Sequence, residues 1–298
     1  MPHVRSSAIL LAAILIAGSA AFSFAQSDWQ KTYPVSAKPS LTFTTGDAEA
    51  ELRSCGECRE IRIRVQWNGR NPSDFPITEA QTGGHVSFEM RERNRMHIMM
   101  GVHHSPQVFI EAPAAIDVEG RTADGSLHVS GVHGELQFHT GDGSVDFDDC
   151  GGAVRLVASD GSIRMHNLTG TLESRSSDGS VRIDGQFSGI QVHTSDGNLD
   201  IALSDGSHLA TASRIESSDG RVSLHLPRTL AADLEIHTSD GRVQCDLPLT
   251  MEGFNSKSDS GHNLRGHLNG GGVPLSIHTS DGNVTIDAMH PGERHEHP

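Results

Sequence analysis

Aspartate followed by glycine recurs at a fixed spacing in this 298-residue chain. Five such pairs begin 18 residues apart, at Asp124, Asp142, Asp160, Asp178 and Asp196, and further pairs begin at Asp219, Asp240 and Asp281. Carboxylates repeated along a surface, with serine hydroxyls beside them, are oxygen ligands of the kind that calcium prefers. Aspartate before glycine also forms tight turns without an ion, because its side chain accepts hydrogen bonds from nearby backbone N–H groups. The aspartates are therefore candidate calcium ligands and, more simply, corner residues.

A second set of polar side chains stands three positions before these aspartates. In it, His193, Glu216 and His237 come from three consecutive repeats. Imidazole and carboxylate are common ligands of transition metals such as zinc. If consecutive repeats stack, this trio is a candidate metal site.

Cysteine occurs four times, at Cys55, Cys58, Cys150 and Cys245. Cys55 and Cys58 form a Cys-x-x-Cys motif between two strand-like segments, where a hairpin turn is expected. A zinc site would need a second motif of this kind, and haem attachment would need a histidine directly after the second cysteine, and the sequence has neither. Cys150 and Cys245 would lie about five coils, or ~24 Å, apart in a stack of strands, too far for a disulfide. A disulfide between Cys55 and Cys58 is therefore expected.

Short β-strands must position these residues. Apolar side chains stand four and six places before each aspartate, as at Phe138 and Leu136, and three and five places after it, as at Val145 and Phe147. This period of two places one face of each strand inward. The repeat predicts an all-β fold, a β-solenoid with coils of about 18–23 residues, Asp-Gly at one corner and a second glycine at the other. A series of antiparallel hairpins is the alternative, and residues 18 apart are neighbours only in the solenoid.

The chain divides into five expected segments. These are a signal peptide at 1–25, a linker at 26–39, an N-terminal β region at 40–120 that begins and caps the solenoid, regular repeats at 121–288, and a histidine-rich disordered tail at 289–298. The apolar run at 8–17 is short for a membrane span and no second run follows, so the mature chain is expected to have no transmembrane segment. Export to the periplasm or the cell surface follows as an expectation.

Composition narrows the possible partners. Aromatic residues make up only 4% of the chain and glycines number 32, which suits a thin solenoid core with frequent turns. A net charge of −15 argues against a nucleic-acid partner, because phosphate binding requires a basic face. An envelope or surface protein, or a glycan, is the expected partner.

The iterated phrase Thr-Ser-Asp-Gly-x-Val-x-Ile, with variants at 194–201, 238–245 and 279–286, resembles the DUF4097 family of adhesin-like β-strand-repeat proteins. The resemblance covers roughly residues 40 to 288 and concerns architecture. It implies an exported or envelope-associated β-solenoid, and it brings no catalytic residues. The Cys-x-x-Cys motif and the many histidines depart from the common form of the family.

Three functions remain open at this stage. The favoured hypothesis is a non-catalytic, adhesin-like envelope or surface module that binds along its polar sheet faces, with no cofactor. The first alternative is a calcium-stabilised, β-roll-like binding protein. The second is a glycan-active β-helix enzyme, whose cleft would lie near the insertions at 204–208 or 259–267 and would hold two carboxylates.

If the aspartates of the Asp-Gly pairs are only corner residues, calcium should leave the stability of the mature protein unchanged. The thermal unfolding midpoint, measured with excess EDTA and again with millimolar calcium, should be the same. A rise of about ten degrees in calcium would contradict it, because an ion that binds only the folded state stabilises that state.

Overall fold

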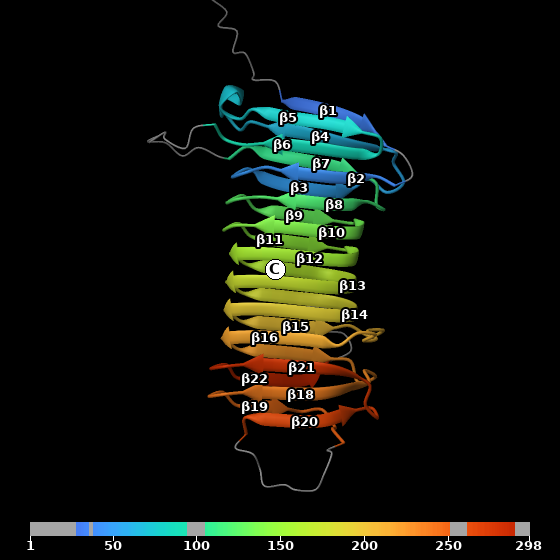
Figure 1. Ribbon diagram of the computed structural model, residues 1–298, viewed down its shortest axis with the longest axis vertical. Helices are drawn as coiled ribbons and strands as arrows, with labels where there is room; N and C mark the ends of the chain where they lie inside the picture. The colour runs from blue at the N-terminus through green and yellow to red at the C-terminus, as the bar shows by residue number, and fades with distance from the viewer. Residues whose placement is uncertain (1–27, 36–37, 94–104, 251–260, 290–298) are drawn as a thin grey trace, which may run out of the picture.

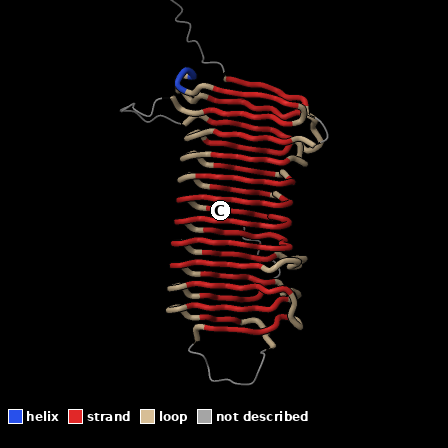
Figure 2. Tube along the Cα trace, in the orientation of Figure 1, coloured by secondary structure: helices blue, strands red, loops and turns tan. Residues whose placement is uncertain are grey.

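The protein is an elongated β-solenoid. The computed structural model describes residues 28–35, 38–93, 105–250 and 261–289, and in them 22 strands form one hydrogen-bonded network, with one short 3-10 helix, η1 (Pro72–Asp74). The strands stack like rungs along the long axis, with turns at both sides (Figures 1 and 2). No helix in these described residues is long and apolar enough to cross a membrane. The predicted all-β, solenoid-like architecture is confirmed.

The strands form two broad faces, which we call face A and face B. Face A contains, in spatial order, β5 (Ile77–Thr82), β6 (His85–Met90), β2 (Ser40–Thr44), β8 (Asp117–Arg121), β10 (His133–Thr140), β12 (Gly151–Asp160), the second halves of β13 (Ile163–Asp178) and β14 (Val181–Asp196), β16 (Ser213–Asp219), β21 (Val273–Thr279), β18 (Ala232–Thr238) and β20 (Asn263–Leu268).

Face B contains, in spatial order, β1 (Trp29–Pro34), β4 (Glu60–Gln66), β7 (Gln107–Ala112), β3 (Glu49–Ser54), β9 (Leu127–Ser130), β11 (Val145–Asp148), the first halves of β13 and β14, β15 (Leu199–Leu203), β17 (Val222–Leu226), β22 (Val284–Ala288) and β19 (Val243–Cys245). Along most of its length each coil gives one strand to each face.

Parallel pairing sets the register of the stack. His133 lies opposite Gly151 on face A, and Val145 lies opposite Ile163 on face B, so partners in these coils are 18 residues apart. The expected inward positions are buried on both faces, as for Leu136, Phe138 and Phe147. Phe138 and Phe147 meet edge to face across the core, with ring centroids 5.2 Å apart. The core is thus a thin column between two sheets.

A column of glycines at the Asp-Gly corners brings successive coils into direct backbone contact. A Cβ atom added at Gly143 would lie 2.2 Å from the carbonyl oxygen of Gly125, and one added at Gly179 would lie 2.2 Å from that of Gly161. The same contact recurs from coil to coil at Gly161, Gly197, Gly220, Gly282 and Gly241. Only a residue without a side chain fits there, which explains why glycine follows each aspartate.

The buried threonine of the repeated phrase forms a hydrogen bond within the same Asp-Gly corner. Thr238 is fully buried, and its hydroxyl accepts a hydrogen bond from the backbone N–H of Gly241 at 2.9 Å. Thr279 does the same for Gly282 at 3.1 Å. These hydroxyls pair backbone donors that the turn would otherwise leave unsatisfied inside the protein.

The coils do not stack in chain order at the two ends. The C-terminal coil, β21 with β22, lies between the β16–β17 coil and the β18–β19 coil. At the other end, β2 with β3 lies between the β6–β7 pair and the β8–β9 coil. At each end of the stack, the coil that comes first or last in the sequence is therefore not the outermost coil in space, and strands from elsewhere in the chain cover it.

Two expectations about the N-terminal part are wrong. The segment at 26–39 is not only a linker, because β1 pairs antiparallel with β4, and its Tyr33 is buried while Trp29 packs on Phe88 with ring centroids 5.6 Å apart. The Cys-x-x-Cys segment does not close a hairpin, because β3 and β4 lie on opposite sides of β7. The signal peptide at 1–25, Asp259 and the tail at 290–298 lie outside the described residues.

Replacement of one corner glycine tests the contact between coils. Gly179→Ala should lower the free energy of unfolding by at least about 2 kcal/mol, because its Cβ overlaps a backbone oxygen that no side-chain rotation can move and because φ is +129°. Urea unfolding followed by circular dichroism measures this. The neighbouring exposed position supplies the control, Ser180→Ala, which should be neutral. Equal stability of Gly179→Ala and the wild type would contradict the corner contact.

Candidate functional site

The structure stacks the corner aspartates but shows no metal centre among them. Asp160, Asp178, Asp196 and Asp219 lie opposite one another on consecutive coils, and Asp124 and Asp142 lie in the turns before them. The pKa of Asp219 is raised by desolvation and by the negative charges of Asp281 and Asp196. Within the described residues, no group of three or more histidine, cysteine, aspartate or glutamate side chains could hold a metal ion. Calcium binding stays the alternative that the melting experiment tests.

The expected trio of His193, Glu216 and His237 is not consecutive. Glu216 lies opposite His193 on one side and His278 on the other, and His237 follows only after His278. His193 Nδ1 is 3.6 Å from a Glu216 carboxylate oxygen, while the rings of His237 and His278 are 6.0 Å apart between centroids. The interpretation assumed that coils stack in chain order, and the C-terminal coil interrupts that order.

The cysteines are arranged as a pair and two single thiols. Cys55 and Cys58 form a disulfide, with their Cα atoms 5.8 Å apart, in the loop between β3 and β4. Cys150 is buried and Cys245 is half-buried, and both are free thiols. Burial raises the pKa of both thiols, so neither has the features of a reactive cysteine.

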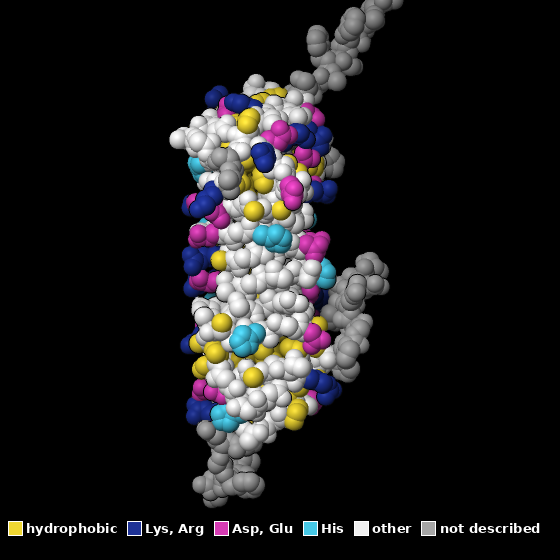
Figure 3. Space-filling view, turned by 90° about the vertical axis from the view of Figure 1, so that its right-hand side faces the viewer, with side chains coloured by type: hydrophobic (Ala, Val, Ile, Leu, Met, Phe, Trp, Pro, Cys, Tyr) yellow, Lys and Arg dark blue, Asp and Glu magenta, His cyan; other side chains and the backbone are white. Residues whose placement is uncertain are grey.

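Face B carries a continuous row of outward side chains. Consecutive members of the row lie directly opposite one another on neighbouring strands, in the order Gln30, Arg64, Phe109, Glu51, His128, Asp146, Arg164, Arg182 and Asp200. Seen from the edge of the solenoid, charged side chains gather along the two margins, where the faces appear in profile (Figure 3). Most of the charged side chains visible in this view therefore project from face A and face B, and few lie on the edge between them.

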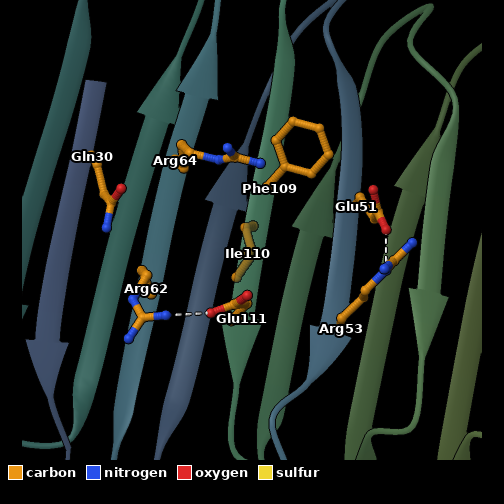
Figure 4. A pocket seen from close by; sticks show the side chains of 8 residues that line it. All are labelled: Gln30, Glu51, Arg53, Arg62, Arg64, Phe109, Ile110 and Glu111. Carbon is orange, nitrogen blue, oxygen red and sulfur yellow. Dashed lines mark hydrogen bonds and ion pairs between the residues drawn. The ribbon is translucent and has the colours of Figure 1, made fainter. Parts of the chain in front are cut away.

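A hollow of about 470 Å³ opens at the N-terminal end of this row. It is lined by side chains from β1, β3, β4 and β7, namely Gln30, Glu51, Arg53, Arg62, Arg64, Phe109, Ile110 and Glu111 (Figure 4). Arg62 donates hydrogen bonds to Glu111 at 2.7 Å and to Glu60 at 2.6 Å, and Arg53 pairs with Glu51. Two of its three arginines are therefore held by carboxylates.

Arg64 differs from the other two arginines. Its guanidinium carbon lies 4.7 Å from the centroid of the Phe109 ring, and it makes no ion pair with the residues that the structure describes. A guanidinium packed on an aromatic face is held in place while its N–H groups stay available. Carboxylates accept two parallel hydrogen bonds from such a group. The hollow is therefore suited to a carboxylate-bearing ligand with an apolar side that packs near Phe109.

Sequence reasoning missed this hollow. The alternation Ile61-Arg62-Ile63-Arg64-Val65 does place Arg62 and Arg64 on one outward face, and that signal could have been used. Phe109 and Glu51 could not be joined to it, because β7 inserts between β4 and β3 against the chain order. The glycan-enzyme hypothesis placed its cleft elsewhere, at 204–208 or 259–267, and residues 259 and 260 of the second insertion lie outside the described part of the chain.

Histidine and carboxylate alternate at the far end of face B. His225 lies between two carboxylates, with Nε2 3.3 Å from Asp200 and Nδ1 2.5 Å from Asp287. Hydrogen bonding to Asp200, and then to Asp287, raises the pKa of His225 to about 9, and His225 in turn lowers the pKa of Asp200. A similar bond to Asp184, at 3.0 Å, raises the pKa of His166. His225 therefore acts as a cation between its two carboxylates.

Comparison with known proteins gives one family and several distant structures. The family model described as Toastrack DUF4097 matches residues 40–287. No curated protein matches the chain. Similar solved structures include a candidate adhesin from Parabacteroides merdae (12% identity, TM-score 0.46, covering 88% of this chain and 97% of that one) and another from Bacteroides fragilis (7%, 0.41, 88% and 98%). A candidate cell adhesion protein from Clostridium sporogenes is also similar (12%, 0.31, 88% and 100%).

The electrostatic account of His225 predicts its titration. A group whose pKa is raised in the folded state stabilises that state fully below its unfolded pKa of 6.5, and this contribution is lost as the pH rises through about 9. NMR titration should find His225 charged at neutral pH, and Asp200→Asn should lower its pKa toward 6.5. The control, Ser223→Ala, removes a neighbour of Asp200 that carries no charge and should leave the titration unchanged. Titration of wild-type His225 near 6.5 would contradict the account.

Proposed function

Because the chain belongs to the Toastrack DUF4097 family, we propose that it is a non-catalytic binding module that is exported to the periplasm or the cell surface. In this proposal it acts as an adhesin-like protein and holds a carboxylate-bearing surface protein or glycan against face B. The contact begins at the hollow around Arg64 and Phe109.

One observation carries this proposal. Arg64 is positioned by the Phe109 ring and makes no ion pair within the described residues, whereas the arginines beside it are neutralised by glutamates. In a chain with a net charge of −15, an arginine that keeps its hydrogen-bond donors available on a polar sheet face is unusual. A ligand carboxylate would complete its bonding, and hydrogen bonds to charged groups are worth about 1.5–3 kcal/mol each.

The pairing of the nearby carboxylates supports a non-catalytic role. Glycoside hydrolysis uses two carboxyl groups, one of which must hold a proton near neutral pH. In the hollow, both carboxylates are instead engaged by guanidinium groups, Glu51 by that of Arg53 and Glu111 by that of Arg62. These carboxylates therefore orient the arginines of the hollow, an arrangement that suits binding.

A binding measurement with a small acidic sugar tests the function. The mature protein should bind a glucuronate-containing disaccharide more tightly than the matched neutral disaccharide, as measured by isothermal titration calorimetry. Arg64→Gln should weaken the binding about tenfold or more, which corresponds to the loss of at least about 1.4 kcal/mol. The same mixture should release no new reducing ends.

A charge-matched variant on the other face serves as the control. Arg155→Gln removes one arginine from face A, where Arg155 Nε lies 2.9 Å from Glu173, and should leave the affinity unchanged. Equal affinity for acidic and neutral sugars, or an equal effect of the two variants, would contradict a site at Arg64. Release of sugar fragments would contradict the non-catalytic role.

A further inference from the structure

Face B carries a second group of arginines far from the hollow. Arg164 on β13, Arg182 on β14 and Arg221 just before β17 line a depression of about 530 Å³, which also has the polar side chains of Ser162, Ser180 and Asn198 on its wall. Arg164 and Arg182 come from consecutive coils, and Arg221 lies two coils beyond Arg182, with the β15 coil between them. We call Arg164, Arg182 and Arg221 the lower arginine cluster.

The three members of the lower arginine cluster differ in their ion pairs. Arg182 Nε donates to Asp200 at 3.2 Å, and Arg164 lies 3.7 Å from a carboxylate oxygen of Asp146, which His128 also approaches at 3.3 Å. The Arg221 guanidinium makes no ion pair with any residue that the structure describes. Arg164 and Arg182 each have about half or more of the side chain exposed. Arg221 therefore keeps hydrogen-bond donors for an anion, and Arg164 and Arg182 add exposed positive charge beside it.

The register of the solenoid places two members of this cluster, Arg164 and Arg182, on the same row as Arg64. Five strand-to-strand steps lead from Arg64 through Phe109, Glu51, His128 and Asp146 to Arg164. At about 4.8 Å per step, the two groups are ~24 Å apart along a flat face. A ligand with a single carboxylate cannot reach both groups, whereas a linear polymer that crosses the strands can.

Building on the proposed function, we propose that the hollow and the lower arginine cluster are two subsites for one linear acidic polysaccharide of the uronate type. The polymer runs along face B, across the strands, and presents carboxylates to Arg64 at one subsite and to the lower arginine cluster at the other. Hydroxyl and amide side chains at both subsites, such as Gln30, Ser162 and Asn198, are partners for sugar hydroxyls.

The row between the subsites favours a polysaccharide over a nucleic acid. Glu51 and Asp146 lie directly under the path, so the polymer must turn its charged groups away from them as it crosses. A sugar chain carries its charge at the edge of each ring and has C–H faces that can pack on Phe109. The flat, open face also suits an extended chain, which needs no deep cavity.

The dependence of affinity on ligand length tests this inference. Calorimetric titration of the full mature protein with oligogalacturonates, from the disaccharide to fragments that exceed the ~24 Å span, should show affinity rising by tenfold or more once both subsites are reached. A triple variant, Arg164→Gln with Arg182→Gln and Arg221→Gln, should lose this gain and keep the affinity for the disaccharide. A triple variant that is lost on purification can be replaced by Arg221→Gln alone, which should reduce the gain.

The outcomes separate this inference from the proposed function. Binding of the disaccharide with no gain for longer fragments would overturn the two-subsite proposal and leave the site at Arg64 intact. No binding of fragments of any length would contradict both. A single-stranded oligonucleotide of matched length and charge should bind more weakly than the long oligogalacturonate, and equal or tighter binding would overturn the assignment to a polysaccharide.

Discussion

The backbone contact between stacked corner glycines is the constraint on which the rest of the structure depends. Gly161, Gly179 and Gly197 each approach the carbonyl oxygen of the glycine one coil away so closely that a Cβ atom would lie 2.5 Å or less from it. Such a contact fixes the register of one coil on the next, because a shift by one residue would place a side chain in the gap and turn every apolar residue outward. Buried threonines such as Thr238 complete the corner by bonding its N–H groups.

A fixed register also organises the surface. Since residues at equivalent positions lie opposite one another, outward side chains form long rows, and like charges in such a row must be separated or paired. Face B shows both solutions, with carboxylates beside arginines at Asp146 and Asp200 and a histidine made cationic between Asp200 and Asp287. Arg64 on this row and Arg221 beside it stand out from this pattern, because neither makes an ion pair within the described residues.

Much of the fold could be predicted from the sequence because the repeat is periodic. The period of two around each Asp-Gly pair identified the buried positions, as Leu136 and Val145 show. The spatial order of the end coils could not be predicted, because β21 and β18 have nearly the same pattern and either fits on β16. For the same reason the consecutive stacking assumed for His193, Glu216 and His237 was wrong. The hollow at Arg64 was missed because it requires β7 to lie between β4 and β3.

The distance between two positions on the row of face B tests the central claim, the strict parallel register. Spin labels at His128→Cys and Ser223→Cys, in a background with Cys150→Ala and Cys245→Ser, are separated by five strand steps through Asp146, Arg164, Arg182 and Asp200. Pulsed electron resonance should then give a single narrow distance near ~24 Å. Antiparallel hairpins that place both strands of each repeat in one sheet would give about twice that distance, ~48 Å, and would contradict the account.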